Sequence, residues 1–166
     1  MTTTERTLIL LRHAKSDWPG SVPDIDRPLA ERGHTQAPLA GQWLASRAGG
    51  VDLAVVSPAR RARETWQLAS AELTSAPPTR IDERVYLASS GRLLQIVREI
   101  PDATRTVVLV GHNPGMEDLA SLFADEPVIM RTCGIAEIGV TGPWAGLDTA
   151  SAVLRAAGRS DGHELG

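Results

Sequence analysis

Residues 7–14 read TLILLRHA, a near-continuous aliphatic run that ends in an arginine and a histidine. Runs without alternating polar residues are typical of strands that are buried on both faces, as in a parallel sheet covered by helices. Two further runs of the same kind, Leu53–Val56 and Val107–Val110, occur later in the chain. The three runs therefore predict the central strands of a buried parallel sheet.

Segments with helical periodicity lie between these runs. Pro38 fits a helix only within its first turn, so we expect the first helix to begin near Thr35. The alternation of strands and helices predicts an α/β fold, a three-layer α/β/α sandwich around a mostly parallel, doubly wound sheet. The expected helices are Thr35–Ala48, Arg60–Leu73, Ser90–Ile100 and Pro114–Phe123. Weaker strand patterns cover Thr79–Asp82, Ile135–Val140 and Ala152–Leu154, the last two toward an edge of the sheet.

Length and composition indicate a single globular domain. The chain has 166 residues, of which 42% are hydrophobic and 22% charged, values that fit one ordinary domain. We expect the domain to span residues 1–158 and the polar residues 159–166 to form a flexible tail. The single cysteine, Cys133, excludes an intramolecular disulfide and a multi-cysteine zinc site.

Charge and hydropathy indicate which classes of partner and which cellular compartment to expect. The formal net charge of −3 predicts that the protein binds neither nucleic acid nor an anionic membrane. The longest early apolar run, Leu8–Leu11, is too short for a signal peptide or a membrane span. We therefore expect a cytoplasmic protein.

Each aliphatic run leads directly into polar residues. In an open parallel sheet, ligands bind in the crevice beyond the carboxyl ends of the strands. Side chains that follow different strands should therefore converge on one pocket. The residues expected there are Arg12, His13, Arg61, Glu83 and His112.

These residue types suit phosphoryl transfer. Arginine forks match a tetrahedral oxyanion, and a neutral imidazole is a competent nucleophile that can carry a phosphoryl group. A second imidazole, when protonated, stabilises negative charge in the transition state. Glu83 could protonate the leaving group and later activate water. The arrangement predicts covalent catalysis in which arginines neutralise the phosphoryl charge, so we expect neither a metal nor another cofactor.

The same residues lie in segments that resemble the histidine phosphatase superfamily, which has the phosphoglycerate mutase-like fold. This resemblance implies that His13 is the nucleophile and that Arg12, Arg61 and His112 hold the phosphoryl group. Four segments carry it in the family's order: Arg12-His13-Ala14, where the family has Arg-His-Gly; Pro28-Leu29 followed by Gly33, Gln36 and Ala37; Ser57-Pro58 followed by Arg61, Ala62 and Thr65; and Gly111-His112-Asn113-Pro114-Gly115.

The length of the chain between the second and last segments indicates a subtype. Residues 68–107 leave room for one strand and one helix but not for the inserted helical lid of two-domain relatives. The chain therefore resembles the compact SixA-like branch, the phosphohistidine phosphatases. Lys15 and Asp26-Arg27-Pro28-Leu29 are also similar to that branch.

The role of Glu83 stays open at this point. Asp82-Glu83-Arg84-Val85-Tyr86 is similar to the stretch that supplies the acid in mutases. Compact members often lack a clear acid, however, and a phosphoramidate leaving group needs less help than an alkoxide because imidazole is protonated near neutral pH. Glu83 is therefore either an acid/base group or a solvated carboxylate.

Three functions follow from this reading. The leading one is a metal-independent phosphatase that removes phosphate from phosphohistidine on a protein, because a shallow pocket without a lid favours a protruding side chain. The alternatives are a small-molecule phosphomonoester phosphatase, with a phosphorylated metabolite as substrate, and a non-catalytic phosphate-binding module. The presence of both histidines and both arginines argues against the third. We expect a monomer or a weak dimer.

Overall fold

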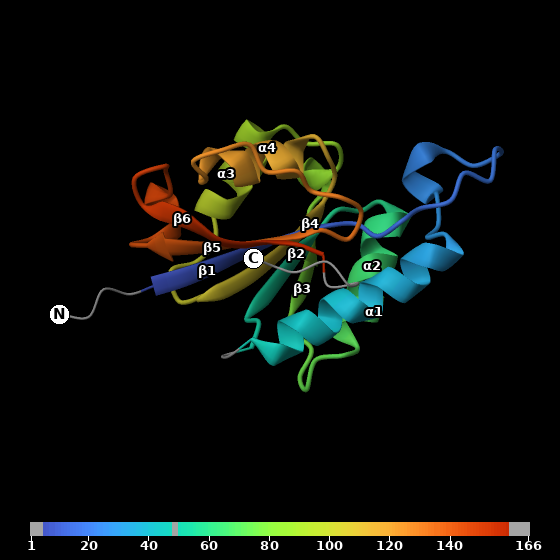
Figure 1. Cartoon of the computed structure of the whole chain (residues 1–166), viewed down its shortest axis with the longest axis horizontal. Helices are drawn as coiled ribbons and strands as arrows, with labels where there is room; N and C mark the ends of the chain where they lie inside the picture. Colours follow the sequence, from blue (N-terminus) through green and yellow to red (C-terminus); the bar gives the residue numbers. More distant parts are fainter. Residues whose placement is uncertain (1–4, 48–49, 160–166) are drawn as a thin grey trace.

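The computed structural model describes residues 5–47 and 50–159 (Figure 1). Within these residues, six strands form one sheet in the order β3-β2-β4-β1-β5-β6. The parallel pairs are β1–β4, β4–β2 and β2–β3, whereas β5 runs antiparallel to both β1 and β6. The mostly parallel sheet is thus confirmed, with β6 at one edge and β5 inside. The strands are β1 Glu5–Arg12, β2 Leu53–Val56, β3 Thr79–Ile81, β4 Thr106–Gly111, β5 Ile135–Thr141 and β6 Ala152–Gly158.

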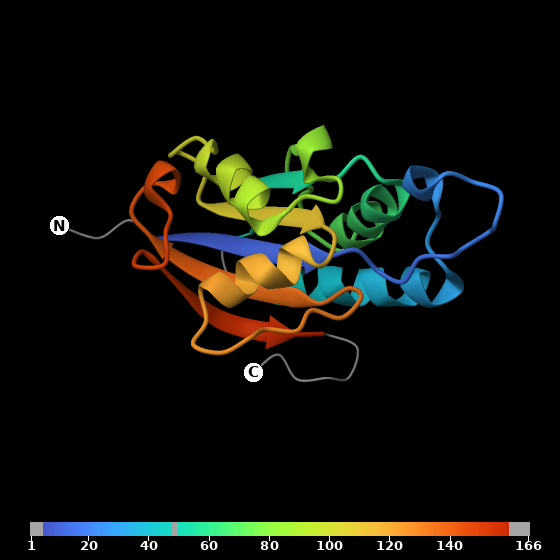
Figure 2. The same ribbon diagram turned by 90° about the horizontal axis from the view of Figure 1, so that it is seen from above.

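Helices cover both faces of this sheet. Helices α3 and α4 lie on one face and α1 and α2 on the other (Figure 1), and the view from above has α3 and α4 in front of the strands (Figure 2). The three-layer α/β/α sandwich is therefore confirmed. The helices are α1 Glu31–Ser46, α2 Arg60–Ser70, α3 Ser90–Arg98 and α4 Gly115–Leu122, with 3₁₀ turns η1 Asp24–Asp26, η2 Glu83–Val85 and η3 Trp144–Gly146.

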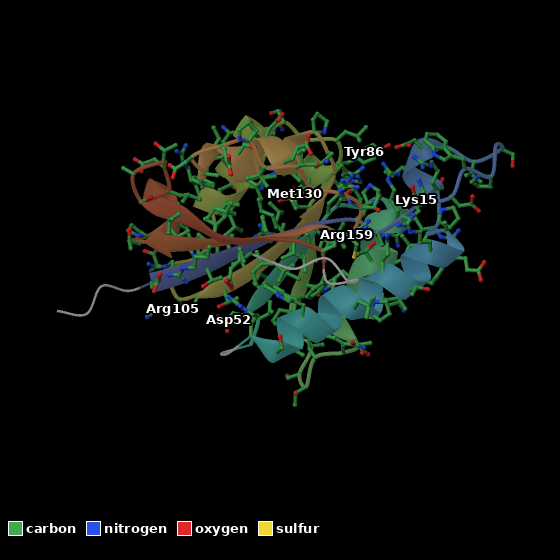
Figure 3. All side chains as sticks on the ribbon, in the orientation of Figure 1. Lys15, Asp52, Tyr86, Arg105, Met130 and Arg159 are labelled. Carbon is green, nitrogen blue, oxygen red and sulfur yellow. The ribbon has the colours of Figure 1, made fainter. Side chains whose placement is uncertain are left out.

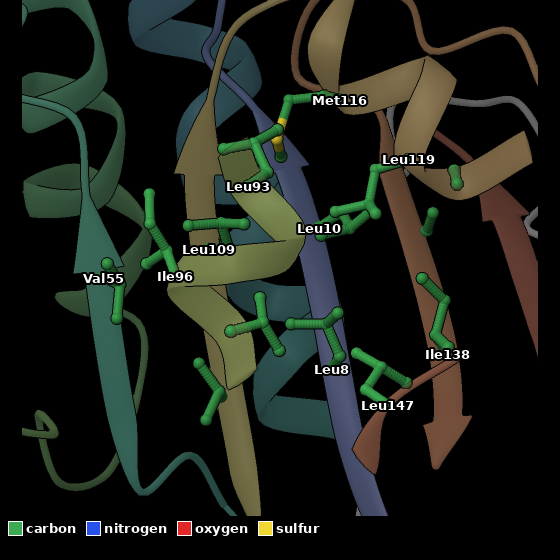
Figure 4. Close-up of a cluster of buried hydrophobic side chains, with 14 of the residues drawn as sticks. Leu8, Leu10, Val55, Leu93, Ile96, Leu109, Met116, Leu119, Ile138 and Leu147 are labelled. Atoms are coloured by element: carbon green, nitrogen blue, oxygen red, sulfur yellow. The ribbon is translucent and has the colours of Figure 1, made fainter. Parts of the chain in front are cut away.

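The central strand β1 is buried on both faces, as its unbroken aliphatic run predicts. Leu8 and Leu10 pack toward α3 and α4 (Figure 4), whereas Ile9 and Leu11 belong to the core beneath α1 and α2. Successive side chains of a strand point to opposite faces, so a strand between two helical layers needs apolar residues at every position. This double burial holds the carboxyl end of β1 firmly at the edge where Arg12 and His13 follow.

The start of the first helix was predicted wrongly. Helix α1 begins at Glu31, and Pro38 lies inside it rather than in its first turn. The backbone N–H of Ala30 donates to the carbonyl oxygen of Lys15 over 2.9 Å, which ties the helix start to the segment after β1. Helix α1 therefore contains the proline although proline removes one helical hydrogen bond, and its start is set by a contact with a distant segment rather than by the local sequence.

The segment between α2 and β4 contains β3, η2 and α3. All of its residues are described, and it holds no inserted helical lid, in agreement with the expectation. None of the described helices is both long and apolar enough to cross a membrane. The tail expected at residues 159–166 falls, except for Arg159, outside the described residues, so its flexibility and the domain boundary stay predictions.

Candidate active site

The parallel pairing of β1 with β4 brings the two motif histidines together. Arg12 is in register with Gly111, and the backbone N–H of His13 donates to the Gly111 carbonyl oxygen over 3.1 Å. Consequently the ring centroids of His13 and His112 lie 5.2 Å apart with an interplanar angle of 55°. Both side chains are buried, with 8% and 4% of their surface exposed.

A neighbouring carbonyl sets the tautomer of His13, and burial sets its protonation state. Its Nδ1 lies 2.8 Å from the carbonyl oxygen of Ala14, and because a carbonyl only accepts, Nδ1 carries the hydrogen. Burial lowers the pKa of His13 to about 4, and the positive charges of Arg61 and Arg12 act in the same direction. The ring is therefore neutral at pH 7, and Nε2 holds a free lone pair, as a nucleophile requires.

The loop that carries His13 is fixed by side chains from both helices of that face. The backbone N–H of Ala14 donates to Thr65 Oγ1 over 2.9 Å, and the Thr65 hydroxyl donates to the Arg61 carbonyl oxygen over 2.7 Å. The backbone N–H of Lys15 donates to Gln36 Oε1 over 2.9 Å. Thr65 and Gln36, both motif residues, thus hold the nucleophile loop rather than act in the chemistry.

His112 follows β4 and is tied to the end of β2. Its Nε2 lies 2.7 Å from Ser57 Oγ, while its buried Nδ1 has no hydrogen-bond partner within the described chain. Burial lowers the pKa of His112 to about 3, with the charges of His13 and Arg61 adding to the effect. A phosphoryl dianion between the rings would raise this pKa, because negative charge favours the protonated form. The protonated second imidazole expected from the sequence therefore requires the substrate's own charge.

Arg12 is oriented by a clamp on the opposite side of the site. Its Nη1 donates to the Met130 carbonyl oxygen over 3.0 Å, and its buried Nε is without a partner among the described residues. Asn113 Nδ2 donates to the same Met130 oxygen, and Glu117 Oε2 accepts from both Asn113 Nδ2 and the Met130 N–H. Burial lowers the pKa of Arg12, opposed by Glu117. Arg12 thus keeps unused N–H groups for an oxyanion.

Arg61 lies in the first turn of α2 and contacts an acidic residue that the sequence did not indicate. Its Nη1 donates to the Asp24 carbonyl oxygen over 2.7 Å and its Nη2 to Asp24 Oδ2 over 3.0 Å. The Tyr86 hydroxyl donates to the same Oδ2, and the Tyr86 ring meets His112 edge-on with centroids 5.6 Å apart. Asp24 and Tyr86 therefore complete the cluster of His13, His112 and Arg61.

Glu83 is not part of this cluster. It begins η2, is exposed, and its side chain forms no hydrogen bond or ion pair within the described residues. Tyr86, three residues later in the same stretch, is the residue that reaches His112. Figure 3 places Tyr86 and Lys15 at the same end of the sheet. The structure thus brings together Arg12, His13, Arg61 and His112, as predicted, while an acid/base role of Glu83 stays a prediction.

The site suits an oxyanion better than a metal ion. Within residues 5–47 and 50–159, no group of three or more His, Cys, Asp or Glu side chains is placed to hold a metal. The unused donors of Arg12 and Arg61 instead lie beside two neutral imidazoles. Such a set can bind a tetrahedral anion and offer it a nitrogen nucleophile.

Comparison with known proteins identifies the family of the chain. Residues 8–124 match the model of the histidine phosphatase superfamily, branch 1. The chain belongs to this superfamily, whose members are phosphatases with a histidine nucleophile.

Individual relatives refine the comparison. The chain is 38% identical over 155 residues to an uncharacterized protein of Mycobacterium tuberculosis, covering 87% of this chain and 96% of the relative. The structure is similar to that of a candidate phosphohistidine phosphatase SixA from Nakamurella multipartitia, with a TM-score of 0.83, 28% identity, and coverage of 93% and 96% of the two chains. A 2,3-bisphosphoglycerate-dependent phosphoglycerate mutase of Mesorhizobium japonicum is 34% identical over 96 residues, 52% of this chain and 46% of the mutase.

Proposed function

We propose that this protein is a phosphohistidine phosphatase that removes the phosphoryl group from a histidine side chain of another protein. The observation that carries the proposal is the state of Asp24, the carboxylate in hydrogen-bond contact with Arg61. Hydrogen bonds from Tyr86, Arg27 and Arg61 hold the pKa of Asp24 well below its usual range. Asp24 is therefore ionised at neutral pH and is a poor proton donor to a leaving group.

This property favours a P–N bond over a P–O bond. An alkoxide leaving group requires a positioned acid. An imidazole protonated on its other nitrogen departs as a neutral molecule and needs none. Neither Asp24, which is ionised, nor Glu83, which is exposed and has no partner among the described residues, is suited to serve an alkoxide. The similarity to SixA proteins supports the same substrate class.

The reaction would proceed in two displacements at phosphorus. His13 Nε2 attacks, the substrate P–N bond breaks, and its electron pair leaves with the substrate imidazole. Arg12, Arg61 and His112 stabilise the charge on the phosphoryl oxygens. Water then attacks phosphorus, the electron pair of the P–Nε2 bond returns to His13, and both protons of the water stay with the released phosphate. The Nδ1–H of His13 keeps its bond to Ala14 throughout.

The other expectations form part of this proposal. A cytoplasmic, metal-independent enzyme that acts on a phosphorylated protein is part of it, and the donor set of two arginines and two histidines supports metal independence. The second candidate, a phosphomonoester phosphatase or mutase, is favoured by the partial similarity to phosphoglycerate mutases, which covers 52% of this chain.

The proposal is tested by a direct comparison of substrates. We would measure kcat/KM for a protein phosphorylated on histidine with phosphoramidate, beside a panel of sugar and glycerate phosphomonoesters. The expected result is a preference for phosphohistidine that His13→Ala abolishes and His34→Ala, at an exposed histidine, leaves intact. Efficient turnover of a phosphomonoester with no activity on phosphohistidine would overturn the proposal.

A further inference from the structure

We infer that Asp24 selects the leaving group by accepting a hydrogen bond from the protonated imidazole of the departing histidine. This inference rests on the proposed function and assigns to one residue the preference for a nitrogen leaving group. The carboxylate of Asp24 lies beside the phosphoryl-binding Arg61, yet it has no role in the two displacements at phosphorus described above.

The hydrogen bonds that Asp24 forms with the described residues leave one acceptor position unoccupied. A carboxylate has about four lone-pair sites. Oδ2 accepts from Arg61 Nη2 and from the Tyr86 hydroxyl, while Oδ1 accepts from Arg27 Nη1 over 3.0 Å. The Asp24 side chain is 41% exposed. Oδ1 can therefore accept one more hydrogen bond from a group that approaches from solvent.

Asp24 borders the site on the more exposed side, where a leaving group must lie. In a displacement at phosphorus, the leaving atom lies opposite the nucleophile. His13 is 8% exposed and forms the floor of the site, so the leaving group must lie on the solvent side. Asp24 and Tyr86, which are less buried and border Arg61 and His112, occupy that side.

The segment that carries Asp24 is built to hold it in place. Arg27 is buried, and besides Asp24 it donates to Ser16 Oγ over 2.6 Å and to the Asp17 carbonyl oxygen over 3.0 Å. Its guanidinium carbon lies 3.2 Å from the centroid of the Trp18 ring. A carboxylate fixed in this way is preorganised, and a preorganised acceptor loses little free energy when the substrate arrives.

Cleavage of the P–N bond requires a proton on the second nitrogen of the substrate imidazole, and an ionised carboxylate stabilises that proton. The substrate imidazole leaves as a neutral ring only if its second nitrogen carries a hydrogen when the P–N bond breaks. An anionic acceptor at that N–H favours the protonated form and raises the pKa of the substrate imidazole. The electron pair of the P–N bond then neutralises the departing ring, and Asp24 neither gains nor loses a proton. An alkoxide has no such N–H, so Asp24 gives it no help.

The groups that face Asp24 limit the size of the effect. Arg61 comes from α2, Arg27 from the same segment, Tyr86 follows η2, and His112 follows β4 and senses the charge of Asp24 through space. The two guanidinium groups offset part of the carboxylate's charge. A hydrogen bond to a charged acceptor contributes about 1.5–3 kcal/mol, which corresponds to a rate change of roughly 10- to 150-fold.

The test compares Asp24→Asn with the wild type on two substrates. A peptide phosphorylated on histidine has an imidazole leaving group. The leaving group of p-nitrophenyl phosphate is the stable p-nitrophenolate anion, which needs no proton. We expect kcat/KM on the peptide to fall by about 10- to 150-fold more than kcat/KM on p-nitrophenyl phosphate, which reports any effect that the substitution has through Arg61. Asp26→Asn, which alters an exposed carboxylate two residues away, should change neither.

The pH profile provides a second readout. The alkaline limb of kcat on the peptide reports loss of the imidazole proton in the enzyme–substrate complex, and we expect Asp24→Asn to move this limb to lower pH by about one unit. Asp24→Glu, which keeps the charge, should retain most of the preference for the peptide. An unchanged limb would overturn the inference.

The outcomes separate this inference from the proposed function. If the wild type does not hydrolyse the peptide at all, both fall. If the wild type hydrolyses the peptide and Asp24→Asn lowers kcat/KM equally on both substrates, only the inference is overturned, because Asp24 then acts solely by holding Arg61. A selective loss on the peptide supports both.

Discussion

Gly33 and Lys15 are in such close contact that there is no room for a side chain between them unless the backbone moves. A Cβ atom on Gly33 would lie 2.2 Å from the carbonyl oxygen of Lys15, whereas real Cβ contacts are essentially never shorter than 3.0 Å. Gly33 lies in the first turn of α1, and Lys15 lies two residues after His13. The first turn of α1 therefore packs directly against the loop that carries His13. This is the turn that the position of Pro38 led us to leave out of the predicted helix.

Gly33→Ala should damage both stability and activity. The obstructing atom is backbone, so the loop or the helix must move, and overpacking of this kind costs about 1–3 kcal/mol. We expect a lower Tm and a reduced kcat/KM on p-nitrophenyl phosphate. Gly91→Ala in α3 is the matched control, because nothing lies within 4 Å of its added Cβ. That variant should stabilise the fold by about 0.5–1 kcal/mol. Wild-type Tm and activity in Gly33→Ala would contradict the contact.

A covalent intermediate should form on His13. Because Nδ1 is occupied by the Ala14 carbonyl oxygen, the phosphoryl group should be attached at Nε2. Phosphate trapped during turnover should be acid-labile and alkali-stable, and mass spectrometry should locate it on His13. His13→Ala should show no label and no turnover while keeping its fold by circular dichroism. Label on Cys133 or on a serine would rule out this mechanism.

Mild acid should destabilise the protein through its two buried histidines. The pKa values of His13 and His112 are lowered to about 4 and about 3 in the folded state, whereas an unfolded histidine titrates near 6.5. The unfolded chain therefore binds more protons as the pH falls. The stabilisation is complete above about pH 6.5 and is lost progressively toward pH 4, by up to about 1.4 kcal/mol per pH unit for each histidine.

His112→Gln isolates this effect. Guanidinium unfolding of the variant between pH 6.5 and 5, in buffers without phosphate, should show a slope against pH that is about one proton shallower than in the wild type. The carboxylates of Asp24, Asp82 and Glu99, whose pKa values are lowered, stay ionised in this window and should not obscure it. Identical slopes would show that His112 is not held neutral.

Turnover should not require a divalent metal. Arg12 and Arg61 supply the positive charge that a metal ion otherwise brings to the phosphoryl oxygens. We expect kcat/KM on p-nitrophenyl phosphate to be unchanged after treatment with excess EDTA and gel filtration. A loss that added magnesium or zinc restores would show that the two arginines do not suffice.

The central strands and the convergence of their ends follow from local sequence. An unbroken aliphatic run such as Leu8–Leu11 is typical of a strand covered on both faces, and parallel pairing then places Arg12, His13 and His112 at one edge. The start of α1 could not be found in this way, because the contact between Gly33 and Lys15 joins segments whose packing no local pattern encodes.

The acidic part of the site was hidden for a different reason. Asp24 follows no strand and lies in a loop rich in proline and glycine, so no periodic element indicates where its side chain points. The hydrogen bond from Tyr86 and the ion pair with Arg61 form only once three distant segments have packed. The motif in residues 82–86 correctly indicated that this segment reaches the site. The residue that contacts the site, however, is Tyr86 and not Glu83.

Glu83→Gln should therefore have little effect on either class of substrate. If Glu83 protonated an alkoxide, its loss would cost about 10²–10⁴-fold on phosphomonoesters and much less on phosphohistidine. Its side chain is exposed and makes no hydrogen bond or ion pair in the described part of the chain, so we expect changes below about threefold on both. The measurement is kcat/KM for the wild type and the variant on one substrate of each type. A large loss confined to phosphomonoesters would identify Glu83 as the acid after all, and a large loss on both would mean that water activation in the second displacement runs through this carboxylate.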